Sequence, residues 1–208
     1  MTPWAGRHTE GRMGLAFGIL IFDDMEELDF AGPFEVFGMS AARKPGDRVL
    51  LIAERSQPVR GAHGLRVLPD CDFASAPPLD VLLVPGGVGT RTQVSNPVLI
   101  EWIRKTAASC RFVTSVCTGT LLLHEAGVVG ERRVTTHWGF VPKLRERGVH
   151  VVENVRYVRD GNLVTSAGVS AGIDMSLWLI GQLYDPDHAR AVQRHMEYDP
   201  APPYAAEV

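Results

Sequence analysis

Short apolar runs alternate with amphipathic segments along most of the chain. Four runs have the composition of strands that are covered on both faces of a sheet, and they occupy residues 15–22, 48–54, 80–85 and 111–116. Residues 98–109 repeat apolar side chains at the i, i+3 and i+4 spacing of a helix, and they follow Asn96 and Pro97, a typical cap and first-turn proline. Strands that alternate with helices predict an α/β fold in which a mostly parallel sheet carries helices on both faces.

Turn signals extend this outline. Residues 23–32 are expected to form a loop, after which Pro33 begins a helix. Asp160 and Gly161 mark a hairpin between two strands. Further elements are expected as helices over 118–127, 140–148, 170–184 and 186–196, as a short hairpin over 61–70, and as a short strand over 132–138. In such sheets chemistry gathers at the carboxyl ends of the strands, so the segments that follow the buried runs are the candidates for a site.

Length and composition indicate one globular domain over residues 14–208, preceded by a polar extension, residues 1–13, that is expected to be disordered. A net charge of −3 without a basic stripe disfavours nucleic acid as a partner. The apolar runs are too short to cross a membrane, and the first dozen residues lack the apolar core of a signal peptide. An odd number of cysteines argues against a disulfide framework, so we expect a cytoplasmic protein with reduced thiols.

The segment Ser115–Gly119 places a cysteine between a buried strand and the next helix. A thiol at that joint faces the N-terminus of the helix, whose partial positive charge favours the thiolate, and the layout is that of a nucleophile elbow. The alternative is a small buried cysteine at a tight turn. The pattern favours Cys117 as a nucleophile, whereas Cys71, expected in a loop, and Cys110, expected at a helix end, are interpreted as structural.

The glycine-rich segment 85–90 follows another buried strand. Its glycines let backbone N–H groups approach a ligand. If the segment lies beside Cys117, the N–H groups of Gly87 and Thr118 are placed to form an oxyanion hole. A phosphate-binding loop is not indicated, because no Gly-Lys-Ser/Thr follows, and a plain turn is the remaining alternative.

Two acids and a histidine complete the candidates. Asp29 stands between Leu28 and Phe30, so burial is expected to raise its pKa and to let it donate or relay a proton. A solvated loop acid or a helix cap is the alternative for this residue. Glu27 and His137 are further candidates, and His137 also fits a hydrogen-bonded core residue. The histidines and cysteines show no metal-ligand spacing, so no metal site is expected.

Together these segments resemble the ThiJ/PfpI superfamily, which is related to the class I glutamine amidotransferase-like proteins. The likeness covers about residues 14–204 and is carried, in order and spacing, by ELDFAGPFEVF, DVLLVPGGVGT, FVTSVCTGTLLLHEAG, RRVTTHWGF and DGNLVTSAGVSAGID. It implies a flavodoxin-like fold with a reactive cysteine at a strand–helix elbow. Within the superfamily, LDFAGP, SVCTG, TTHW and EYDPAPPY are most similar to the isocyanide hydratases.

The likeness to that group implies a hydro-lyase without cofactors that acts on a small molecule. In the group a cysteine attacks the isocyanide carbon, an aspartate assists, and the thioimidate is hydrolysed to an N-formamide; carried over, these residues are Cys117 and Asp29. The likeness also implies a homodimer whose subunit contact lies near the site.

The resemblance also bears on other activities. Thr118 stands where the protease-like and glyoxalase-like members have a histidine directly after the cysteine, which disfavours both of those activities. The same blocks occur in the amidase-like domain of certain AraC-type regulators. Two alternatives therefore stay open: a redox or electrophile sensor that uses the same thiol, and a small-molecule-binding domain without catalysis.

Overall fold

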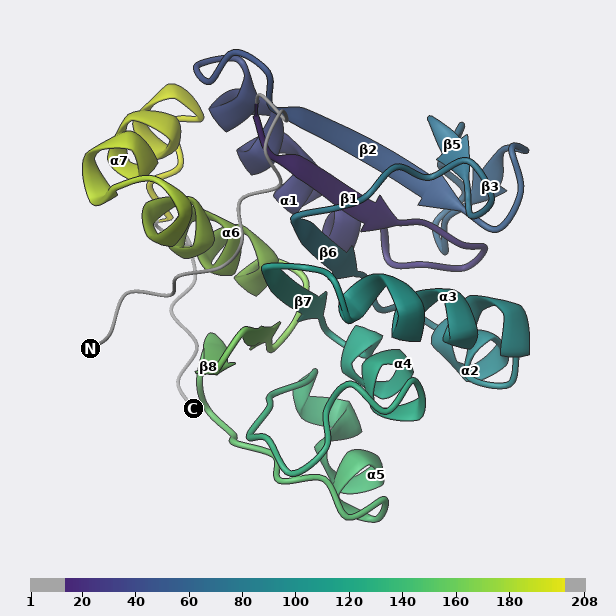
Figure 1. Cartoon of the computed structure of the whole chain (residues 1–208). Helices are drawn as coiled ribbons and strands as arrows, with labels where there is room; N and C mark the ends of the chain where they lie inside the picture. Colours follow the sequence, from purple (N-terminus) through teal and green to yellow (C-terminus); the bar gives the residue numbers. More distant parts are fainter. Residues whose placement is uncertain (1–13, 201–208) are drawn as a thin grey trace.

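The computed structural model describes residues 14–200, which fold around a seven-stranded sheet (Figure 1). The order of strands across the sheet is β5-β2-β1-β6-β7-β9-β8. Neighbouring strands are parallel except for β8 and β9, which form an antiparallel hairpin. The strands of this sheet are β1 (Ala16–Leu20), β2 (Arg48–Ala53), β5 (Cys71–Asp72), β6 (Val81–Val84), β7 (Phe112–Val116), β8 (Tyr157–Asp160) and β9 (Leu163–Ser166). The expected flavodoxin-like α/β architecture is confirmed.

The strand order reverses at β1, which pairs with β2 on one side and with β6 on the other. The chain moves outward through β2 and β5, returns past β1, and then continues in the opposite direction through β6, β7 and β9. At such a switch point the connections diverge and leave a crevice outside the carboxyl ends of the strands. The segments that follow β1, β6 and β7 therefore meet at this edge.

Helices cover both faces of the sheet (Figure 1). One face carries α1 (Glu27–Ala41), α6 (Ala171–Leu183) and α7 (Pro186–His195), which pack on one another, and the other carries α2 (Thr90–Gln93), α3 (Pro97–Ala107) and α4 (Gly119–Glu125). Right-handed crossovers explain the division, because connections that leave β1 and β6 in opposite directions place their helices on opposite faces. The small elements are β3 (Val59–Arg60), β4 (Arg66–Val67), η1 (Trp138–Phe140) and α5 (Val141–Arg145).

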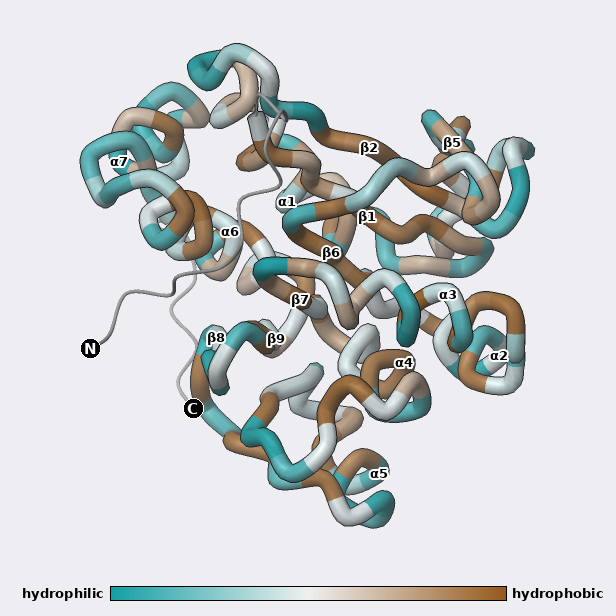
Figure 2. The backbone as a smooth tube through the Cα atoms, viewed as in Figure 1, coloured by the Kyte–Doolittle hydropathy of each residue, from teal (hydrophilic) through white to brown (hydrophobic). Residues whose placement is uncertain are grey.

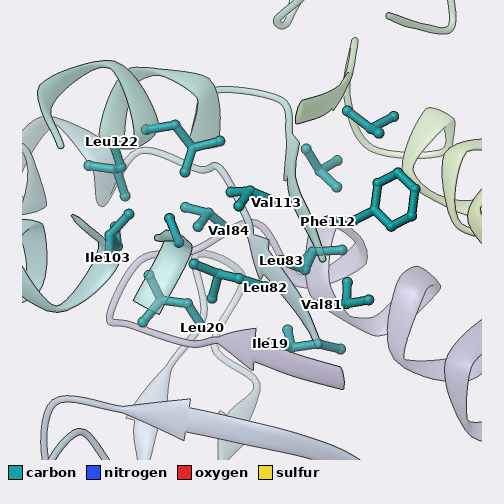
Figure 3. Close-up of a cluster of buried hydrophobic side chains, with 14 of the residues drawn as sticks. Ile19, Leu20, Val81, Leu82, Leu83, Val84, Ile103, Phe112, Val113 and Leu122 are labelled. Atoms are coloured by element: carbon teal, nitrogen blue, oxygen red, sulfur yellow. The ribbon is translucent and has the colours of Figure 1, made fainter. Parts of the chain in front are cut away.

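The core lies against the central strands. Figure 2 shows β1, β2, β6 and β7 as largely hydrophobic stretches, whereas much of α7 is hydrophilic. In Figure 3 the side chains of β1 and β6 meet Ile103 of α3 and Leu122 of α4. All residues of β1, β6 and β7 are buried, because both faces of these strands are covered.

The expected loop over 23–32 and the helix start at Pro33 are wrong. α1 already begins at Glu27, and Pro33 lies buried inside it. A proline removes one intrahelical hydrogen bond, here the bond to the carbonyl of Asp29 four residues earlier. Packing of α1 on α6 offsets this loss: a Cβ on Gly172 of α6 would lie 3.4 Å from Cγ of Pro33. As a result Asp29 stands in the first turn of a helix.

The strand expected over 132–138 is also wrong, since it reduces to a single bridge between Val134 and Val151. Side chains bind the backbone groups that a strand ladder would use. The N–H of Thr135 donates to Oγ1 of Thr165 at 2.7 Å, and the carbonyl of Thr135 accepts from Oγ1 of Thr120 at 2.9 Å. Cys71, expected in a loop, instead begins the short edge strand β5.

Other local signals are confirmed. Asn96 caps α3 through a side-chain oxygen that accepts from the N–H groups of Val98 and Leu99. The hairpin β8–β9 turns at Gly161, which has a φ of +63°. The disorder expected of residues 1–13 lies outside the described residues. Within residues 14–200, no helix is long and apolar enough to cross a membrane.

Candidate active site

Cys117 lies where β7 ends and α4 begins, as the sequence predicts. Its φ of +56° is left-handed, a conformation that costs a residue other than glycine about 1–2 kcal/mol. Two hydrogen bonds hold it there: its N–H donates to the carbonyl of Ser166 at 3.1 Å, and its carbonyl accepts from Oγ1 of Thr136 at 2.8 Å. Gly119 lets α4 approach β6, because a Cβ at this position would lie 2.1 Å from the carbonyl oxygen of Val84. The strained turn places the side chain of Cys117 beside the turn after β6, since a Cβ on Gly86 would lie 2.8 Å from Cβ of Cys117.

Asp29 is fully buried in the first turn of α1 and lies near Cys117, close enough that each group shifts the pKa of the other. Its two oxygens also accept backbone hydrogen bonds, Oδ2 from the N–H of Gly86 at 2.9 Å and Oδ1 from the N–H of Val169 at 3.0 Å. Burial raises the pKa of Asp29 from 3.8 to about 7, against the opposing effect of the two N–H donors, and the negative charge of Glu26 raises it further. The sequence-based expectation of a raised pKa agrees with this environment.

The glycine turn after β6 borders the thiol directly. Gly87 has a φ of +113°, and a Cβ there would lie 2.3 Å from the backbone nitrogen of Glu26, so only glycine fits. The N–H groups of Gly87 and Thr118 lie near the thiol of Cys117 and act to lower its pKa. The two residues expected to form an oxyanion hole are thus brought together beside Cys117, and their role stays a prediction.

The thiol itself is not a resident thiolate. Burial raises the pKa of Cys117 to about 12, and the charge of Asp29 raises it as well, whereas the donors on Thr118 and Gly87 only partly oppose these effects. The expectation that the helix N-terminus favours the thiolate is thus outweighed, because α4 is short and Cys117 is only 7% exposed.

The carbonyl of Gly87 is fixed from the side opposite its N–H. It accepts from Oγ1 of Thr90 at 2.8 Å and from a guanidinium nitrogen of Arg91 at 2.7 Å. The Gly87 N–H also approaches Oγ1 of Thr118 at 3.1 Å. These contacts fix the orientation of the Gly87 peptide beside Thr118.

His137 lies beside the thiol rather than in contact with Asp29. A Cβ on Gly168 would be 3.3 Å from Cβ of Cys117 and 3.3 Å from Cδ2 of His137, so the two side chains flank the space in front of Gly168. Nδ1 of His137 accepts from the N–H of Gly139 at 3.2 Å. In the neutral ring the proton is therefore on Nε2, which makes this atom a donor rather than a base.

Glu27 is directed away from the thiol. Its oxygens accept from the N–H and Nδ1 of His63 at 2.6 and 2.7 Å, and this hydrogen bond raises the pKa of His63. Among the described residues, one group has the spacing of metal ligands. It consists of one possible ligand atom each from Glu26, Glu27 and His63, and these atoms lie within 4.8 Å of one another. The carboxylate of Glu27 is already engaged by His63, so the group is an exposed ion pair in this structure.

Sequence reasoning missed the N–H of Val169 as a partner of Asp29. Val169 has a φ of +44°, an unusual conformation for a β-branched residue. Asp29 and Val169 are 140 positions apart, so no local pattern predicts their hydrogen bond. The Ala-Gly-Val sequence before α6 gives only a sign of a turn.

Comparison with known proteins identifies relatives along nearly the whole chain. Isonitrile hydratase of Pseudomonas putida is 41% identical over 192 residues, which make up 92% of this chain and 82% of that protein. The transcriptional regulator GbdR of Pseudomonas aeruginosa is 27% identical over 205 residues, 96% of this chain and 55% of the regulator.

Structure and family comparison agree. A crystal structure of a ThiJ/PfpI family protein from Pseudomonas syringae matches with a TM-score of 0.87 and 31% identity, over 99% of this chain and 87% of that one. The profile of the DJ-1/PfpI family matches residues 17–182. Because this match and the relatives extend over most of the sequence, the chain belongs to the DJ-1/PfpI family.

Proposed function

We propose that the protein is a hydratase that adds water to isocyanides and releases N-formamides, with Cys117 as its nucleophile. The observation that carries the proposal is the burial of Asp29 beside Cys117: the N–H of Gly86 donates to Oδ2 of Asp29 at 2.9 Å, and a Cβ on the same glycine would lie 2.8 Å from Cβ of Cys117. The similarity to an isonitrile hydratase over 92% of the chain supports the substrate class.

The first half of the reaction forms a bond between sulfur and carbon. Asp29 accepts the thiol proton while the sulfur of Cys117 attacks the terminal carbon of the isocyanide, and the carboxyl then delivers the proton to that carbon. The product is a thioimidate, R–N=CH–S–Cys. The N–H groups of Gly87 and Thr118 stabilise the negative charge on sulfur as the proton leaves.

The second half consumes water. Asp29 accepts a proton from the attacking water, whose oxygen adds to the thioimidate carbon while the nitrogen gains a proton. The carbon–sulfur bond then breaks, the formamide R–NH–CHO leaves, and the sulfur regains a proton. The balance is one isocyanide plus one water for one formamide, and the route uses only groups of this chain.

The test is turnover of an aryl isocyanide, followed by absorbance of the aryl formamide. We expect Cys117→Ala to abolish turnover and Asp29→Asn to lower kcat by about 10²- to 10⁴-fold, the usual contribution of one positioned acid/base. Cys71→Ala is the matched control, because Cys71 is a free cysteine on the edge strand β5, and it should retain wild-type rates. Near-wild-type turnover by Cys117→Ala would refute the mechanism.

A small-molecule-binding role without catalysis is the second candidate. It is favoured by the similarity to GbdR, a transcriptional regulator that this chain matches over 96% of its own length. Tight binding of an isocyanide or formamide without any product would support it. The sensor alternative has less support, because a buried thiol with a raised pKa oxidises slowly.

A homodimer and a cytoplasmic location are parts of the same proposal. Exposed apolar side chains support the dimer: Leu28 and Phe34 on α1 are 38% and 37% exposed, and Leu65 on the β3–β4 hairpin is 50% exposed. That hairpin packs against the start of α1, since the N–H of Ala62 donates to the carbonyl of Met25. Sedimentation velocity measures the mass directly. The three free cysteines support a reducing compartment.

A further inference from the structure

A pocket opens beside Gly168 and His137, and Cys117 borders the same space in front of Gly168. Its volume is about 370 Å³. The residues that line it include Thr136, His137, Trp138, Val155, Gly168 and Val169. Pockets of this size commonly hold small organic molecules.

The pocket shares its inner wall with the candidate active site. Three of its lining residues contact that site: a Cβ on Gly168 would touch both Cys117 and His137, Thr136 donates to the Cys117 carbonyl, and the N–H of Val169 binds Asp29. A molecule whose reactive carbon is at the sulfur therefore has this pocket as the adjacent space for the rest of its structure.

Charged groups at the rim are engaged by neighbours. Arg156 donates to Asp174 at 2.6 Å, and Glu153 pairs with Arg145. Apart from Asn154 and His137, the other lining residues are glycine or carry aromatic, aliphatic or hydroxyl side chains. Such a lining fits an uncharged, apolar group better than a charged one.

Trp138 differs from an ordinary tryptophan in that it lines the pocket while 82% of its surface is exposed. It begins η1 directly after His137, and the centroids of the two rings are 5.3 Å apart. The N-cap bond from Gly139 to His137 fixes this turn. An indole held in place at the mouth of a pocket offers a flat apolar face to a ligand.

We propose that this pocket receives the organic substituent of the isocyanide and that Trp138 stacks on it, so that the enzyme selects aryl and other flat apolar substituents. The inference rests on the proposed function and assigns its substrate class. His137 forms the inner wall, and Trp138 the outer wall, of the substituent site.

The experiment compares phenyl isocyanide with methyl isocyanide in wild type, Trp138→Ala and Trp138→Phe. For phenyl isocyanide we expect Trp138→Ala to raise KM about 5- to 10-fold, the size of one aromatic contact, with kcat within about twofold. The KM for methyl isocyanide, which lacks the ring, should change by less than about twofold in Trp138→Ala. Trp138→Phe should keep most of the preference. Val98→Ala on α3 is the control, because Val98 is an apolar side chain, 54% exposed, that is not part of this pocket.

A binding measurement separates this inference from the proposed function. Calorimetry with N-phenylformamide reports on the substituent site without any turnover. If wild type turns over neither isocyanide but binds N-phenylformamide more tightly than Trp138→Ala does, the hydratase proposal fails and the substituent site stands. The substituent site is refuted if N-phenylformamide binds wild type and Trp138→Ala equally, or binds neither of them. It is also refuted if Trp138→Ala raises the KM for phenyl isocyanide and for methyl isocyanide by the same factor.

Discussion

The buried carboxyl of Asp29 links the stability of the protein to pH. In the unfolded chain this group has its ordinary pKa of 3.8, whereas in the folded protein burial raises the pKa to about 7. The folded state therefore binds more protons between these values, and the free energy of unfolding falls as pH rises through this window. A difference of about 3 pKa units at 1.36 kcal/mol each gives about 4 kcal/mol, fully present below pH 4 and lost above pH 7. About 3 kcal/mol of it lies between pH 5 and pH 8.

The variant Asp29→Asn removes this dependence. An amide has one accepting oxygen, so it satisfies only one of the N–H groups of Gly86 and Val169 and opposes the other with its own donor. This mismatch costs about 1–3 kcal/mol at every pH. The wild type and the variant should therefore differ in the slope of stability against pH, not only in stability at one pH.

Urea denaturation at pH 5, 6, 7 and 8, followed by far-UV circular dichroism, measures both slopes. We expect the wild type to lose about 3 kcal/mol more than Asp29→Asn between pH 5 and pH 8, with unchanged m-values. Asp187→Asn is the control, because the side chain of Asp187 is 92% exposed, and it should follow the wild-type slope. Equal slopes in the wild type and Asp29→Asn would refute the raised pKa of the buried carboxyl.

Two further predictions concern Cys117. In the proposed mechanism the reaction starts from a Cys117–Asp29 pair that holds one proton. Below pH about 7 the pair holds two protons, so kcat/KM should rise with pH through about 7. Rates measured from pH 5 to 9 test this, and a fall in kcat/KM over that range would contradict it. The positive φ of Cys117 suits glycine, so Cys117→Gly should be more stable than Cys117→Ala by roughly 1 kcal/mol in urea denaturation, and the reverse order would show that this turn is not strained.

The sequence by itself determined much of the sheet. The buried strands β1, β2, β6 and β7 are continuous apolar runs, because any parallel strand with both faces covered needs one. The cap at Asn96 and the hairpin at Gly161 are likewise local, since each depends on residues within a few positions. The strand–helix joint at Cys117 follows from the same patterns, whereas the burial of this thiol does not.

Only the tertiary structure decided where α1 begins, because the cost of Pro33 inside a helix is local while the packing on α6 that offsets it comes from the far end of the chain. The same holds for the chemistry of the site. Asp29 meets Gly86, 57 positions away, and Val169, 140 positions away. The thiol is protonated rather than ionised because burial and the neighbouring carboxylate outweigh the helix N-terminus. Desolvation and charge proximity depend on what surrounds a group in space, and the linear sequence does not contain that information.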